Sequence, residues 1–116
     1  MKMLKAVLAL FELGALGPMA GCAGPLARAE SQFAEGHYPA AKQAFVSLET
    51  QSAAWAGPER AEYALYRGLT HAALGDRAHA RQWLRDAQAI EDGHPSSLSR
   101  QDVQRLKVGL DSLGSE

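Results

Sequence analysis

An internal repeat of helix pairs constrains this chain of 116 residues more than any other feature. The segment around Gly36 recurs around Gly75, at an offset of 39 residues, with matching side chains at equivalent positions. The other matched positions are Ala29 and Gly68, Ala41 and Ala80, Lys42 and Arg81, Gln43 and Gln82, and Phe45 and Leu84. A helix pair cannot bury its apolar face alone, so repeated pairs stack on one another. Alanine is abundant and β-branched residues are few, which favours helices over strands. The sequence therefore predicts an all-α fold.

Five segments show apolar residues at helical spacing, and these predict five helices. Pro25, Pro39 and Pro58 open the first three, because a proline in the first turn lacks only an N–H group that has no partner there. A loop is expected over residues 50–57, and Asp76 is expected to cap the fourth helix. The breakers between the segments are Gly36, Gly57, Gly75, Gly93 and Pro95.

The fifth helix has the clearest start signal in the chain. Ser99 and Asp102 have the spacing of a capping box, with Asp in place of the usual Glu or Gln. A narrow apolar stripe follows, made by Val103, Leu106, Leu110 and Leu113. Because its other faces are polar, this helix is expected to close the stack of helices.

Each of the two units contains a series of small and bulky residues. These are Ala29, Gly36, Tyr38, Ala41 and Phe45 in the first unit, and Gly68, Gly75, Ala80, Leu84 and Ala87 in the second. This pattern resembles the tetratricopeptide repeat over about residues 25–92. It departs from that family in its longer period and in Arg67, His71 and Arg77, which stand where the family prefers Leu, Tyr and an aromatic residue. The alternative is a generic antiparallel helical bundle without repeat ancestry.

The resemblance implies a concave surface that binds another protein, through docking of a helix or peptide in a groove. Carried over by position, its candidate residues are Leu26, Glu30, Phe33, Glu62, Leu65, Leu69 and Ala72. In so short a stack, the alternative is that Phe33, Leu65 and Leu69 are simply buried by the fifth helix.

Trp55 lies in the expected loop and is a further candidate for the protein-binding surface. An exposed tryptophan is a typical anchor at an interface. The alternative is that Trp55 folds back over the helix pair.

The N-terminus has the layout of a secretory signal. Lys2 and Lys5 precede an apolar stretch of about eleven residues, too short for the roughly 20 that span a bilayer. The run Met19-Ala20-Gly21-Cys22 then resembles the lipobox of bacterial lipoproteins.

The lipobox resemblance implies cleavage before Cys22 and lipid, such as palmitate, on that cysteine. Residues 1–21 are then a signal peptide, residues 22–25 a lipidated N-terminus with a short linker, and residues 26–113 the helical-repeat domain. Ala23 in place of Asp points to the outer membrane of a Gram-negative cell, facing the periplasm. Glu12 interrupts the apolar stretch, so the alternative is an amphipathic helix of a cytosolic protein with an ordinary thiol at Cys22.

The sequence offers no motif for catalysis, a cofactor or nucleic acid. Residues 1–21 take away two lysines and one glutamate, which leaves a net charge of −2 and no basic excess for nucleic acid. The four histidines (His37, His71, His79 and His94) show no i, i+4 pair on one helix, so no metal site is expected. The expected function is a lipid-anchored envelope adaptor or scaffold. The alternative is an obligate structural or assembly subunit of an outer-membrane complex, such as a pilus or secretion machine.

Overall fold

The structure is a computed structural model that describes residues 24–114, and in this part of the chain the secondary structure consists of helices joined by turns and loops, without strands. A first helix covers residues 24–34. It is followed by α2 (Tyr38–Ser47), α3 (Glu49–Ser52), α4 (Gly57–Ala73), α5 (Arg77–Gly93) and α6 (Arg100–Leu113). The all-α prediction is confirmed. The signal peptide and Cys22 lie outside the described residues.

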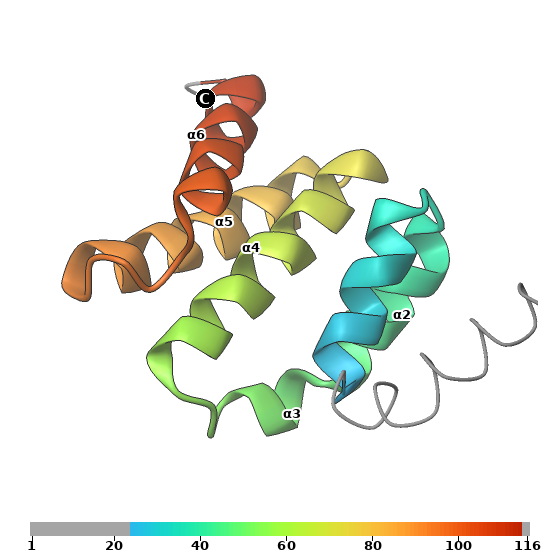
Figure 1. The fold of residues 1–116 in the computed structure, drawn as a ribbon. Helices are drawn as coiled ribbons and strands as arrows, with labels where there is room; N and C mark the ends of the chain where they lie inside the picture. The colour runs from blue at the N-terminus through green and yellow to red at the C-terminus, as the bar shows by residue number, and fades with distance from the viewer. Residues whose placement is uncertain (1–23, 115–116) are drawn as a thin grey trace, which may run out of the picture.

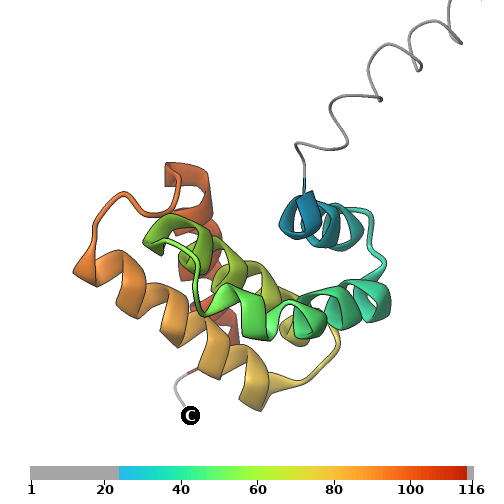
Figure 2. The same ribbon diagram turned by 90° about the horizontal axis from the view of Figure 1, so that it is seen from below.

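The helices form two antiparallel pairs and a final helix. Figure 1 shows the first helix beside α2, and α4 beside α5, with α6 lying against the second pair. Seen from below in Figure 2, the two pairs form one layered body, and the short α3 leads from the first pair to the second. This is the order of elements that the repeat predicts.

The loop expected over residues 50–57 is wrong in its first part, where α3 forms a helical turn. The backbone N–H of Ser52 donates to the carbonyl of Leu48 at 2.8 Å, and the Ser52 hydroxyl donates to the carbonyl of Glu49 at 2.7 Å. Ser52 is buried, so packing favours this turn over an open loop.

The glycines and capping residues predicted from the sequence lie at the helix ends in the structure. Gly36 and Gly75 have φ angles of +85° and +83°, a left-handed conformation that glycine adopts without strain. The Asp76 side chain accepts a hydrogen bond from the His79 N–H at 3.2 Å. Ser99 accepts one from the Asp102 N–H at 3.1 Å, which is the first half of the predicted capping box, whereas the Asp102 carboxylate accepts from Tyr66 and Arg105.

The α4 and α5 helices cross closely because Gly68 lies at their contact. A Cβ atom at this position would stand 2.7 Å from Cδ2 of Leu84, a side chain that is fully buried. The small residue expected here from the repeat therefore has a direct physical role.

An edge-to-face ladder of aromatic rings joins three helices in the core. Phe45 of α2 packs on Tyr63 of α4, and Tyr63 packs on Trp83 of α5, with ring centroids 5.9 and 5.7 Å apart. The Tyr63 hydroxyl donates to the carbonyl of Phe45 at 2.6 Å, so the one polar atom of this buried ring is paired.

The last helix, α6, packs on the second pair. Leu106 and Leu113 are buried, and a Cβ at Gly109 would stand 3.1 Å from both Leu69 Cδ2 and Leu84 Cδ1. This helix therefore completes the core, as expected, and covers part of the predicted concave face. None of the helices between residues 24 and 114 combines the length and the apolar character needed to cross a membrane.

Candidate functional site

The residues predicted to form a binding surface differ in how far they are buried in the structure. Leu65 is fully buried in the core, so its assignment to that surface is wrong. Its helix, α4, packs against α2, α5 and α6, and the side chain has no route to solvent. The other candidates are half-buried: Leu26, Glu30, Phe33, Glu62, Leu69 and Ala72.

An apolar hollow of about 520 Å³ lies between the first helix, α4 and α6. Phe33, Leu69 and Ala72 line one side of it, and Val108 and Gly109 of α6 line the other. Val108 is 60% exposed, which leaves a large apolar side chain at the rim. The last helix therefore narrows the predicted surface without filling it.

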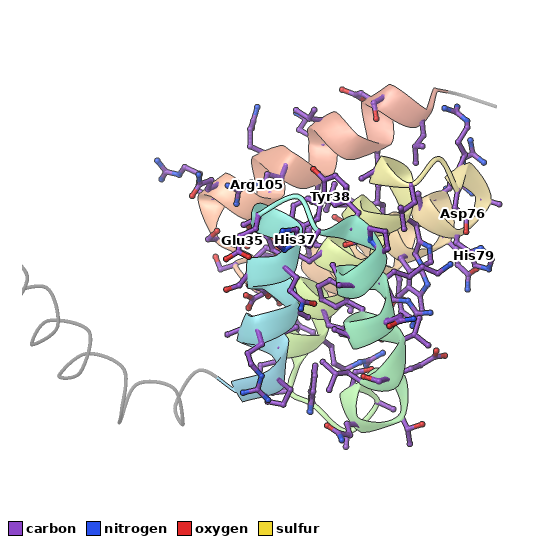
Figure 3. All side chains as sticks on the ribbon, turned by 90° about the vertical axis from the view of Figure 1, so that its right-hand side faces the viewer. Glu35, His37, Tyr38, Asp76, His79 and Arg105 are labelled. Atoms are coloured by element: carbon purple, nitrogen blue, oxygen red, sulfur yellow. The ribbon has the colours of Figure 1, made fainter. Side chains whose placement is uncertain are left out.

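A second hollow of about 570 Å³ adjoins the first, because Phe33 and Arg105 line both. Glu30 and Tyr66 make this second hollow more polar than the first. We call the two hollows together the concave groove. Leu26 lines neither of them, and Figure 3 shows Arg105 on α6.

The acidic end of the concave groove holds a carboxyl group with a high proton affinity. Burial, followed by the hydrogen bond and negative charge of Glu62 and the charge of Asp102, raises the pKa of Glu30 to about 9. Oε2 of Glu30 is buried without a hydrogen-bond partner. A hydrogen bond between the Glu30 and Glu62 carboxyls needs one of the two to hold a proton, which is why their contact raises the proton affinity of Glu30.

A hydrogen-bonded cluster ties α6 to α4 beside this carboxyl. The Tyr66 hydroxyl donates to Oδ1 of Asp102 at 2.7 Å and accepts from Nη1 of Arg105 at 2.8 Å. Burial, then the hydrogen bond to the Asp102 carboxylate, raises the pKa of Tyr66 above its ordinary value. The wall of the concave groove is thus fixed by a neutral tyrosine between two opposite charges.

Trp55 lies away from the concave groove. Its ring packs edge-to-face on Tyr63, with centroids 5.7 Å apart, and it is half-buried. It therefore folds back over the second helix pair, which is the alternative that the sequence analysis gives to an exposed interface anchor.

A buried arginine forms a polar centre that the sequence analysis did not recognise. Arg67 is 7% exposed; its Nη1 donates to Glu49 Oε1 at 3.0 Å and to the Tyr63 hydroxyl at 2.9 Å. Its guanidinium also lies 4.4 Å from the centroid of the Trp83 ring. The signal was present in the sequence, because Arg67 and His71 occupy positions where the repeat family is apolar or aromatic.

Two histidines of different helices, for which no metal site is expected from their spacing in the sequence, come together in space. His71 lies in the last turn of α4 and His79 in the first turn of α5, and their rings stack with centroids 5.3 Å apart. The Asp76 carboxylate lies between them, with Oδ2 at 2.8 Å from His79 Nδ1 and 3.5 Å from His71 Nδ1. Burial, followed by the charge of Arg67, lowers the pKa of His71 and so favours its neutral form.

Comparison with known proteins found no family model, no curated protein and no solved structure that matches this chain. The function is therefore inferred from the concave groove and the N-terminal sequence.

Proposed function

We propose that this protein is a lipid-anchored adaptor of the bacterial envelope, which binds a segment of another protein in the concave groove. The observation that carries this proposal is the apolar part of that groove. Phe33, Leu69 and Ala72, which belong to the surface implied by the repeat resemblance, line a hollow that reaches solvent between α4 and α6.

The dimensions of the groove suit the apolar side chains of a docked helix or peptide. Ligand sites in proteins commonly have volumes of about 300–1,000 Å³, and each of the two hollows lies in this range. An amphipathic helix would place its apolar residues against Leu69 and Val108. Its polar residues would then meet Arg105 and Gln104 at the edge.

The proposed anchor stands close to the folded domain. The described part of the first helix begins at Gly24, two residues after Cys22. A lipid on Cys22 would therefore hold the concave groove near the membrane surface, since the chain between anchor and helix is too short to extend far. The Ala23 that follows Cys22 supports outer-membrane placement of this proposed lipoprotein.

Binding can be tested with two neighbouring alanines of α4. Ala72 lines the concave groove, whereas Ala73 is exposed beside it. A photo-crosslinking amino acid at Val108 should yield a discrete product in cells, and Ala72→Arg should abolish that product. The matched control Ala73→Arg, which adds the same charge and volume outside the groove, should leave it. Equal products from the two variants would refute groove binding.

The alternative of an obligate subunit predicts different solution behaviour. An adaptor with its own core should be a folded monomer when the full chain is purified in detergent. Aggregation, or melting near room temperature without a partner, would instead support a subunit that is stable only inside a larger complex.

The lipid anchor has a separate test. Cys22→Ser should move the protein from the outer-membrane fraction into a soluble fraction, because lipidation requires the thiol. If the Ser variant remains in the outer membrane, the anchor proposal fails while groove binding is still open to the crosslinking test.

A further inference from the structure

The turn between α4 and α5 brings two imidazole rings and one carboxylate into a single cluster. His71 lies in the last turn of α4, Asp76 is the N-cap of α5, and His79 lies in the first turn of α5. Because Gly75 adopts a positive φ of +83°, the chain reverses within a few residues and the side chains meet. Figure 3 shows Asp76 and His79 together beside this turn.

The three side chains can each direct one atom at a common point. The candidate atoms, an imidazole nitrogen from each histidine and a carboxylate oxygen from Asp76, all lie within 4.8 Å of one another. The shorter of the two contacts from Asp76 Oδ2 goes to His79 Nδ1, at 2.8 Å. Ligands spaced in this way can bind one small cation with little rearrangement.

The second observation is independent of this spacing. The His71 side chain is only 4% exposed, and its Nδ1 is buried without a hydrogen-bond partner. This nitrogen is turned toward the Asp76 carboxylate, at 3.5 Å. A buried nitrogen left unpaired in a folded protein calls for a physical explanation, and a bound ion is one.

We propose that His71, Asp76 and His79 bind a divalent transition-metal ion of the zinc class. Two imidazole nitrogens and one carboxylate oxygen suit Zn²⁺, whereas Ca²⁺ and Mg²⁺ take oxygen ligands. The His79 side chain is 59% exposed and that of Asp76 is 35% exposed, so an ion can enter from solvent and keep a water molecule as its fourth ligand. The ion would join the end of α4 to the start of α5.

The charges around the cluster set the conditions for binding. The positive charges that act on His71 come from Arg67, His79 and Lys42, and the Asp76 carboxylate opposes them. The Arg67 Nε–H donates to His71 Nε2 across a long distance of 3.4 Å. Metal on Nδ1 places the imidazole proton on Nε2, so this weak bond must break. Arg67 would keep its contacts to Glu49, Tyr63 and Trp83.

The test uses the full chain with Cys22→Ser, which removes the only thiol, purified in detergent without a histidine tag and stripped with EDTA. Titration calorimetry with ZnCl₂ should give one Zn²⁺ per chain. His79→Ala and Asp76→Asn should each weaken binding about tenfold or more. Asp76→Asn keeps a good helix cap, and His79 is exposed, so both variants should retain the fold, which circular dichroism checks.

His94→Ala is the matched control, because His94 is an exposed histidine beyond the end of α5. It should bind Zn²⁺ as the parent does, and nitrogen NMR of the parent should show the metal on Nδ1 of His71 and His79. Absence of saturable binding would overturn the proposal. So would equal weakening in His94→Ala, or unchanged affinity in both ligand variants. The outcome is independent of the proposed adaptor function, because none of the three ligands lines the concave groove.

Discussion

Gly68→Ala should destabilise the protein, although alanine is the better helix former. The added Cβ would stand 2.7 Å from Cδ2 and 2.8 Å from Cγ of Leu84. These distances are about 0.7–0.8 Å inside the best separation of two carbon atoms, about 3.5 Å. The backbone nitrogen of Leu84 is also close, at 3.1 Å, and it can move only if the helix moves.

Leu84 has no room to retreat. It is fully buried, and its Cδ1 already faces Gly109 of α6, where a Cβ would stand 3.1 Å away. Overpacking of a core costs about 1–3 kcal/mol, and alanine in place of glycine returns up to about 1 kcal/mol of helix propensity. Because the clash reaches backbone, we expect a net loss of about 2 kcal/mol. For a domain of this size, that lowers Tm by about 10 °C.

Urea unfolding followed by circular dichroism measures this loss, with an unchanged m-value as evidence that the unfolded state is the same. Gly93→Ala is the control, since a Cβ there would meet nothing within 4 Å, and it should be neutral or stabilising. In the background of Leu84→Ala, where the clash is absent, Gly68→Ala should cost much less. If Gly68→Ala is as stable as the parent, the close contact between α4 and α5 is not as described.

Two other substitutions test the acidic end of the groove and the start of the last helix. The folded pKa of Glu30, about 9, lies above its ordinary value of 4.5, so between these values the folded chain holds one more proton and its unfolding free energy falls as the pH rises. Glu30→Gln should remove this pH dependence. In urea melts at about pH 8, its free energy of unfolding should exceed that of the parent by about 1–2 kcal/mol, after allowance for solvent screening of a half-buried group. Equal pH profiles for parent and variant would contradict this expectation. Ser99→Ala should cost about 1 kcal/mol by loss of the hydrogen bond to the Asp102 N–H, and Ser99→Asp should restore it in thermal melts; a loss that Asp does not restore would exclude capping as the cause.

The parts of the fold that depend on neighbouring residues were predictable from the sequence. A glycine that reverses the chain, as at Gly75, and a side chain that caps a helix, as at Asp76 and Ser99, act within three or four residues. These interactions therefore depend only on residues that are close in the sequence, and they determine the helix boundaries.

The burial of Arg67 could not be predicted in the same way. An arginine is stable inside a protein only when partners surround it, and here these come from α3, α4 and α5. The histidine cluster has the same origin, because His71 and His79 are eight residues apart and meet only after the chain has turned. Sequence spacing on a single helix does not detect either arrangement.

The concave groove could be predicted from the sequence only in part. Leu65 and Leu69 are four residues apart and so lie on one face of α4, yet the first is buried and the second borders an open hollow. At Leu69 the neighbouring helix is α6, where a Cβ at Gly109 would stand 3.1 Å from Leu69 Cδ2, and Leu69 and Gly109 line the hollow together. A residue's place on a stripe thus predicts its helix face, while solvent access is decided by the neighbouring helix.

The buried guanidinium of Arg67 has a consequence for how the protein unfolds. Arrays of repeats often open one unit at a time, because each unit touches only its neighbours. Here the separation of α3 from α4 would break the bond to Glu49 and leave a positive charge in an apolar setting, which is costly. The amide protons of α2 and α4 should therefore exchange with solvent together, in one cooperative event, and not in two successive steps.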